Sequence, residues 1–172
     1  MTNSAFFYVD GTPTKGVWHD IDSTTDTDDV LEALAAANCI PRDEDGEPEY
    51  GGVLLVADVE GDLARAFYSS RRGTLDLDDL VEAIEYCEYN DVDEGAVAAY
   101  INDRSGWSRR DFEDVYCGEY DSKQAYAEQL CDELGLHEVP ESIKPYIDYE
   151  KFARDLFTTD YNFVDGYVFR VT

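Results

Sequence analysis

Residues 77–90 have the sequence LDDLVEAIEYCEYN, and this stretch decides the central part of the fold. Its apolar residues recur at offsets 0, 3, 4, 7 and 10, the spacing that places side chains on one face of an α-helix. That apolar face consists of Leu77, Leu80, Val81, Ile84 and Cys87. The acidic residues between them lie off it. The pattern therefore predicts an amphipathic helix whose outer surface carries a row of carboxylates.

This helix lies in a segment without basic residues. Gly73–Asp103 contains no Lys or Arg and ten Asp or Glu residues. A second helix is indicated by apolar residues from Val92 to Ile101, and Asp103–Gly106 is expected to end it. We therefore expect residues 71–107 to form a central acidic helical domain.

The residues before this domain predict a small sheet with one helix packed on it. The β-rich runs alternate and are separated by a Gly-Thr-Pro turn signal, and acidic residues crowd the first turn of the expected helix. The expected elements are the strands Ala5–Val9, Gly16–His19 and Val53–Ala57 and the helix Asp26–Asn38. Residues 1–70 are thus expected to be an N-terminal α/β domain.

The residues after the central domain mix both types of element. Asp165-Gly166 is a two-residue turn signal between two β-rich runs, and Gly135 stands where a helix stop belongs. The expected elements are helices over 108–115, 123–134 and 149–157, an extended segment over 116–120, and a hairpin over 161–171. Residues 108–172 are thus expected to be a C-terminal α/β domain, and the chain as a whole an α+β protein of three small domains.

The charge of the chain restricts its partners. The sequence has 13 Lys and Arg against 40 Asp and Glu, a net charge of −27. Such a chain repels nucleic acid and anionic membranes, whose binders are basic, so positively charged surfaces or cations are the expected partners. The longest apolar run, Val53–Ala57, is far too short to span a membrane, and the start shows no secretion signal. The cysteines lack a C-x-x-C pair, which favours buried free thiols in a reducing cytoplasm.

No constellation of residues predicts catalysis or a dedicated metal site. The two histidines, His19 and His137, are isolated, and no Gly-rich phosphate loop or zinc-binding pattern is present. The acidic loops at Asp43–Gly46 and Asp91–Asn102 put glycine at the wrong position for an EF-hand. We therefore expect no catalytic residues, no cofactor, no metal ligands and no enzymatic activity.

The spacing of the acids suggests imitation of DNA. At the charge density of duplex DNA, one charge per about 1.7 Å, the 27 net charges would cover roughly 46 Å. A compact chain of this length has a diameter of roughly 40 Å. Carboxylates at phosphate-like positions could therefore occupy a basic DNA-binding cleft. The candidate acidic surface consists of Asp78, Asp79, Glu82, Glu85, Glu88, Asp91, Asp93, Glu94, Asp111, Glu113 and Asp114.

Two alternatives remain open from composition. The chain has the acidic, lysine-poor composition of proteins whose charge serves solubility, as in halophiles. It could also be a cation-binding module. Solubility predicts carboxylates spread evenly over the surface, whereas mimicry predicts a continuous ribbon of them.

The C-terminal third carries a family resemblance. It contains YCGEYDS at 116–122, LCDELG at 130–135, VPE at 139–141, YIDYE at 146–150, FARDL at 152–156 and YNFV at 161–164. These stretches resemble the ArdA family of antirestriction proteins. Asp22 after Trp18, the run Val53–Asp58 and the acidic helices resemble that family's first two domains, so that the resemblance covers nearly the whole chain.

The resemblance implies an elongated protein of three small domains in a row, forming a homodimer through its C-terminal region. It also implies a cytoplasmic protein of mobile genetic elements that blocks the DNA groove in the methyltransferase core of type I restriction-modification enzymes. The family's antirestriction motif matches Glu133, Leu134, Gly135, Pro140, Glu141, Tyr146 and Asp148. The segment Gly61–Gly73 departs from the family because Arg65, Arg71 and Arg72 add positive charge there.

Overall fold

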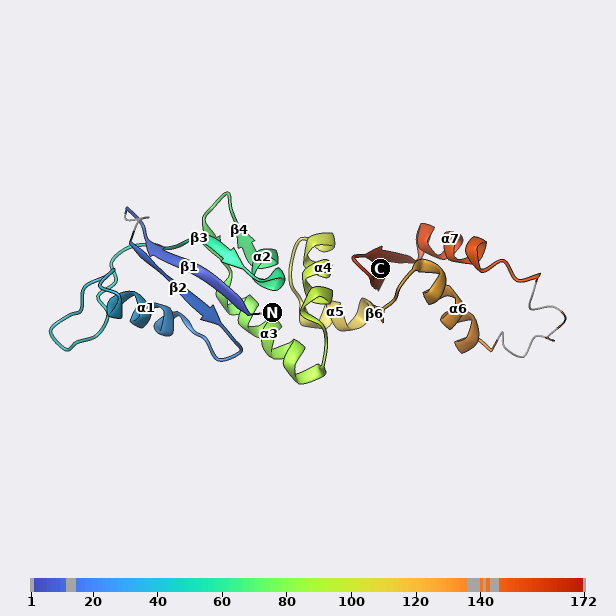
Figure 1. The fold of residues 1–172 in the computed structure, drawn as a ribbon, viewed down its shortest axis with the longest axis horizontal. Helices are drawn as coiled ribbons and strands as arrows, with labels where there is room; N and C mark the ends of the chain where they lie inside the picture. Colours follow the sequence, from blue (N-terminus) through green and yellow to red (C-terminus); the bar gives the residue numbers. More distant parts are fainter. Residues whose placement is uncertain (1, 12–14, 136–139, 141, 143–145, 172) are drawn as a thin grey trace. The chain divides into compact units, whose positions relative to one another are not determined.

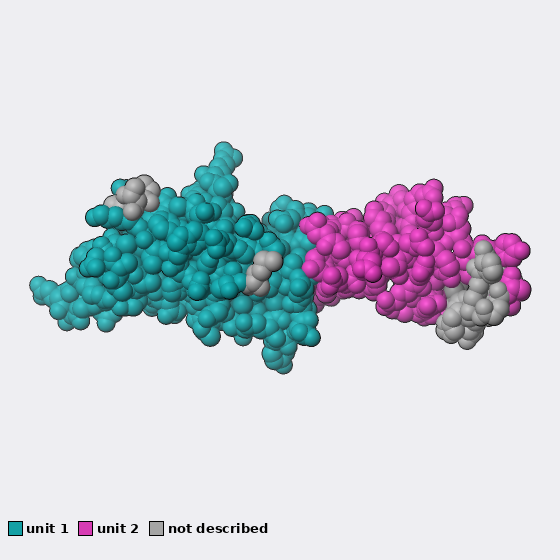
Figure 2. Space-filling model, viewed as in Figure 1, with its two compact units in different colours: residues 1–107 teal, residues 108–172 magenta. Residues whose placement is uncertain are grey.

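The computed structural model describes residues 2–11, 15–135, 140, 142 and 146–171. It has helices and small antiparallel sheets, which confirms the α+β class (Figure 1). The chain forms two compact units, residues 1–107 and 108–172 (Figure 2). The expected further division of the first unit at residue 70, and the expected elongated arrangement, stay predictions.

The first unit is built on a three-stranded antiparallel sheet in the order β2-β1-β3. The strands are β1 (Asn3–Val9), β2 (Gly16–Ile21) and β3 (Leu54–Glu60). The predicted hairpin and third strand are therefore confirmed, although residues 12–14 of the predicted turn lie outside the described residues. Both β2 and β3 extend beyond the predicted runs because each pairs with the start of β1.

One face of this sheet is buried by helices. Helix α1 (Thr27–Ala36) begins at the N-cap Asp26, which exchanges hydrogen bonds with Asp29 in a capping box. Its buried Val30 and Leu34 contribute to the same core as Ala5 and Phe7 of β1. The predicted helix Asp26–Asn38 is thus confirmed, with ends that differ by one or two residues.

A short helix and a hairpin that the sequence did not indicate follow β3. They are α2 (Asp62–Phe67), β4 (Tyr68–Ser69) and β5 (Thr74–Leu75). Asn3 of β1 joins α2 to the rest of the unit. Its side-chain Oδ1 accepts from the backbone N–H of Ala64 at 3.1 Å, and its Nδ2 donates to Glu94 at 3.0 Å. A polar side chain that is only 2 % exposed is therefore fully used in holding strand and helices together.

Two longer helices complete the first unit. Helix α3 (Leu77–Asn90) and helix α4 (Glu94–Arg104) confirm the two predicted central helices. Each ends at a residue in the left-handed conformation, Asp91 after α3 and Ser105 after α4. Helix α2 packs against both helices, so the sheet and the central helices share one buried region.

The second unit contains a three-stranded antiparallel sheet in the order β6-β8-β7 and helices around it. Its elements are α5 (Arg109–Val115), β6 (Tyr116–Glu119), α6 (Lys123–Glu133), α7 (Tyr149–Thr159), β7 (Tyr161–Val164) and β8 (Tyr167–Arg170). Asp165 and Gly166 both have positive φ angles, 51° and 95°, which confirms the predicted two-residue hairpin turn. Aromatic contacts form much of the core, with Phe112 stacked on Tyr116 at 4.9 Å between ring centroids.

Candidate functional site

Four exposed carboxylates follow the outer side of α3, and we call Asp78, Glu82, Glu85 and Glu88 the acidic stripe. Their spacing of four, three and three residues keeps them on neighbouring turns over about 15 Å of helix axis. The opposite side of the helix is buried, since Leu80 and Ile84 are 0 % and 3 % exposed. Among the described residues, no side chain forms a hydrogen bond or an ion pair with the stripe. The stripe therefore presents uncompensated negative charge to solvent.

The carboxylates at the start of α3 repel one another. The pKa of the half-buried Asp79 lies above its usual value of 3.8, first because of partial burial and then because of the charges of Asp76, Glu82 and Asp78. The negative charges of these neighbours make Asp79 harder to ionise. A cation placed near these carboxylates would lower their mutual repulsion.

The raised pKa of Asp79 predicts how stability changes with pH. Because the pKa of Asp79 is raised in the folded chain, the folded state binds a proton more readily, and lowering the pH should stabilise it until the pH falls below 3.8. Two other carboxyl groups have the opposite effect on stability, because hydrogen bonds lower their pKa values. They are Asp22, bound to Thr24, and Glu32, bound to Arg42. Their effect is felt only near and below the unfolded pKa values of 3.8 and 4.5. We expect the thermal midpoint, followed by circular dichroism, to rise from neutral pH to pH 4.5. A steady fall over that interval would contradict the raised pKa of Asp79, and Asp79→Asn should flatten the rise.

Three further acidic candidates have structural contacts of their own. Asp91 ends α3 with a φ of 54°. The side chain of Asp93 caps α4 by accepting from the N–H of Gly95 at 2.7 Å, and Glu94 accepts from Asn3. The carboxylates of Asp93 and Glu94 thus have a stabilising role beside any role in binding, whereas Asp91 ends α3 through its backbone.

The remaining acidic candidates lie on α5 in the second unit. Glu113 forms an ion pair with Arg109, one turn earlier, at 3.1 Å. Asp111 lies in the first turn, where its backbone N–H donates to the cap Ser108, and Asp114 is exposed. Of these three, Glu113 is partly neutralised by its basic neighbour.

The residues of the expected antirestriction motif lie at helix ends. Glu133 is the last residue of α6 and accepts from Gln129 at 2.9 Å. Leu134 follows as the C-cap with 65 % of its surface exposed, and Gly135 has a positive φ of 79°. The glycine therefore permits the turn that ends α6.

The second half of the motif leads into α7. Asp148 caps this helix by accepting from the N–H of Lys151 at 2.9 Å. Tyr146 is 84 % exposed and Pro140 is exposed, whereas Glu141 lies outside the described residues. Asp148 thus has a clear local function, while Tyr146 and Leu134 are large apolar side chains left in solvent.

One exposed residue that sequence reasoning missed continues the stripe. Tyr89, which is 85 % exposed, lies one turn after Glu85 on α3. The signal that could have found it is its position four residues after a stripe member, which places it on the same side of the helix.

The cysteines are free thiols with different surroundings. Cys87 and Cys131 are buried, and Cys39 and Cys117 are half-buried. Burial, together with the charges of Glu94, Asp93 and Glu88, raises the pKa of Cys87 to about 12. Burial also raises the pKa of Cys131. The thiolate is the reactive form, so neither buried thiol is an activated nucleophile.

Alkylation should separate the two pairs of cysteines. In the native protein at pH 8, iodoacetamide should modify Cys39 and Cys117 and leave Cys87 and Cys131 intact until denaturant is added. Peptide mass spectrometry measures each site. Rapid modification of Cys87 in the native protein would contradict its burial.

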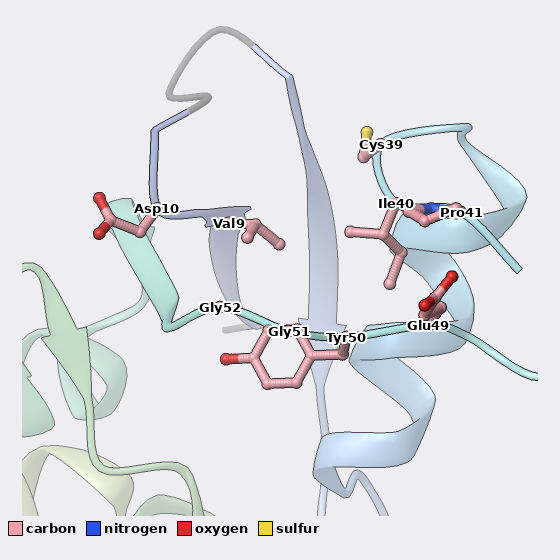
Figure 3. A pocket seen from close by; sticks show the side chains of 9 residues that line it. All are labelled: Val9, Asp10, Cys39, Ile40, Pro41, Glu49, Tyr50, Gly51 and Gly52. Atoms are coloured by element: carbon pink, nitrogen blue, oxygen red, sulfur yellow. The ribbon is translucent and has the colours of Figure 1, made fainter.

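One cavity in the first unit, of about 550 Å³, is lined by Val9, Asp10, Cys39, Ile40, Pro41, Glu49, Tyr50, Gly51 and Gly52. Figure 3 shows the carboxylates of Asp10 and Glu49 on opposite sides of this cavity, with the Tyr50 ring between them. None of the nine lining residues is a histidine.

Within residues 2–11, 15–135, 140, 142 and 146–171, no group of three or more His, Cys, Asp or Glu side chains is arranged to hold a metal ion. In that same part of the chain, no helix has the length and apolar character needed to cross a membrane.

Comparison with known proteins identifies the family of the chain. No curated protein matches the chain. The family model described as antirestriction protein (ArdA) matches residues 7–169, nearly the full length. The match spans both compact units, from β1 to β8. The chain therefore belongs to the ArdA family of antirestriction proteins.

Proposed function

We propose that this antirestriction protein acts as a DNA mimic that inhibits type I restriction-modification enzymes. In this proposal, its carboxylates occupy the DNA-binding groove of the methyltransferase core. The observation that carries the proposal is the acidic stripe, a row of four exposed carboxylates without a basic partner among the described residues. Family membership supplies restriction-modification enzymes as the class of target.

The spacing of the stripe supports a phosphate-like function. Its members follow one another at about 5 Å along the helix axis, and phosphates of one DNA strand at about 3.4 Å. Lysine and arginine side chains that bind phosphates are flexible enough to bind carboxylates at this spacing. Since such contacts read charge and not bases, they require no sequence information.

The raised pKa of Asp79 supports the same function. Partial burial is the first cause of this raised pKa and the charges of neighbouring acids are the second, and basic side chains placed between these acids would relieve the second part. The carboxylates at the start of α3 therefore repel one another in the free protein, and a basic groove would relieve this repulsion. If the acidic residues served solubility alone, placing them this close together would bring no advantage.

The proposal includes three finer statements. The protein functions as a homodimer joined through residues 108–172, so that two copies extend the charged track. It binds the enzyme in the cytoplasm without contacting nucleic acid. It performs no reaction of its own, so its inhibition depends on concentration and is reversible.

Competition tests the proposed function directly. Purified protein is added to a type I methyltransferase core bound to a fluorescently labelled duplex, and anisotropy follows release of the DNA. We expect release at low salt and weaker release as salt rises, because salt screens the contacts. DNA binding that is undiminished at low salt and excess protein would refute mimicry and leave solubility as the function of the charge.

A further inference from the structure

One face of the three-stranded sheet is left open. Cross-strand partners lie on the same face, so the alternation along β1 separates Ala5 and Phe7 from Phe6 and Tyr8. Ala5 and Phe7 are 0 % and 2 % exposed and face the helices. Phe6 and Tyr8, on the other face, are only half-buried. Their neighbour Trp18 of β2 is 45 % exposed, an unusual state for such a large apolar side chain.

The open face carries a fixed aromatic pair. Phe6 and Trp18 are direct partners across β1 and β2, and their rings meet edge to face at 5.8 Å and 66°. This contact restrains Trp18 although its ring is exposed. A restrained exposed indole is the kind of side chain that anchors protein interfaces.

Carboxylates surround the aromatic pair. Asp58 is the partner of Phe6 across β3, and Asp20 and Glu60 flank Ser4 in the next row of the sheet. All three acids are exposed. Among the described residues, Asp20 and Glu60 have no polar partner, and Asp58 accepts only from its neighbour Val59 at 2.9 Å.

We propose that this open face, defined by Phe6, Trp18, Asp20, Asp58 and Glu60, is a docking surface for an arginine-rich segment of a partner protein. A guanidinium stacks on an indole and binds carboxylates through two parallel hydrogen bonds. An apolar partner would leave the carboxylates buried without compensation, and nucleic acid would be repelled by them. The surface therefore selects a planar cation.

This inference rests on the proposed function for the source of the segment, the basic groove of the restriction-modification enzyme. It adds a different kind of contact to that function. The acidic stripe offers charge alone, which salt weakens, whereas stacking on Trp18 depends on shape and persists at higher salt. The sheet face would thus fix where the inhibitor sits along the groove.

The test uses octa-arginine as a probe and needs no enzyme. Calorimetric titration compares the intact protein with Trp18→Ala and with Val171→Ala, a control that trims another apolar side chain of the same exposed fraction, 45 %, away from the open face and the acidic stripe. Loss of a cation–π contact should weaken octa-arginine binding about 3- to 30-fold in Trp18→Ala. Val171→Ala should bind octa-arginine as the unaltered protein does. The Trp18 substitution should weaken the binding of octa-lysine less than the binding of octa-arginine.

A second readout locates the binding site. In a proton–nitrogen NMR spectrum the indole N–H signal of Trp18, assigned with Trp18→Phe, should shift on titration, and that of Trp107 should not. Equal affinity of Trp18→Ala and the intact protein, or an unshifted Trp18 signal, would overturn the docking surface. If Trp18-dependent binding is found but the intact protein fails to displace DNA from the methyltransferase, the surface stands and the proposed function falls.

Discussion

Neutralising the whole acidic stripe should weaken displacement of DNA from the methyltransferase core about 30-fold, if four exposed charge contacts contribute about 0.5 kcal/mol each. The variant combines Asp78→Asn, Glu82→Gln, Glu85→Gln and Glu88→Gln. Each single substitution should have little effect, because the charge is spread along the helix and no residue dominates. The midpoint of the anisotropy competition at fixed low salt measures both.

A control of equal charge separates position from net charge. Glu44, Asp45, Glu47 and Glu49 are exposed in the loop before β3, and their neutralisation changes the net charge by the same amount. This variant should inhibit nearly as well as the unaltered protein. An equal loss in both variants would assign the effect to total charge and contradict a special function of the stripe. A single stripe substitution that abolished inhibition in a folded protein would instead indicate a specific contact.

Gly61→Ala should destabilise the first unit by about 2–4 kcal/mol, from the left-handed backbone and the hydrogen bonds it displaces. Gly61 has a φ of 98°, and a Cβ there would overlap Oδ1 of Asn3 and lie 3.1 Å from its Cα. Asn3 could then no longer accept from Ala64 and donate to Glu94 together. Urea unfolding followed by tryptophan fluorescence measures the change in free energy of unfolding.

Gly46→Ala provides the matched control for this prediction. Gly46 has a similar φ of 90°, but nothing lies within 4 Å of its added Cβ. It should cost only the backbone strain, about 1–2 kcal/mol. If the two variants lose the same stability, the contact with Asn3 contributes nothing. Should Gly61→Ala fail to fold at all, Asn3→Ala tests the same two hydrogen bonds without backbone strain.

Elements with a strong local pattern were predictable from the sequence. Helix α3 alternates apolar and acidic residues with helical spacing, and Asp165-Gly166 sets the hairpin of β7 and β8 by turn chemistry alone. In both cases the information lies within about a dozen neighbouring residues. The ArdA resemblance added the family, which no periodicity could supply.

Helix α2 was not predictable in this way. It has six residues, and its N-cap Gly61 offers no side-chain hydrogen bond. The helix is held by Asn3, 61 residues away from Ala64, and by the complete burial of Leu63 and Ala64. Such a helix is a product of tertiary contacts, which single-sequence patterns do not contain.

The candidate site was predicted by residue type but not by residue environment. A count of acidic residues does not show what surrounds each one. Glu82 faces solvent and Asp93 caps α4, whereas Glu113 is paired with Arg109. It also could not find the open sheet face, because Trp18 and Phe7 are both large and apolar. Only the register of β1 and β2 shows which face remains uncovered.

The position of β1 in the middle of its sheet constrains how the protein matures on the ribosome. This strand leaves the exit tunnel early, but its outer neighbour β3 ends only at Glu60. At about 5–20 residues per second, translation takes roughly 3–10 s to reach the end of β3 after β1 is complete. During that interval β1 has one edge whose backbone hydrogen-bonding groups are unpaired. A stretch of slow codons before residue 60 should therefore increase aggregation during synthesis. Faster elongation there should reduce it.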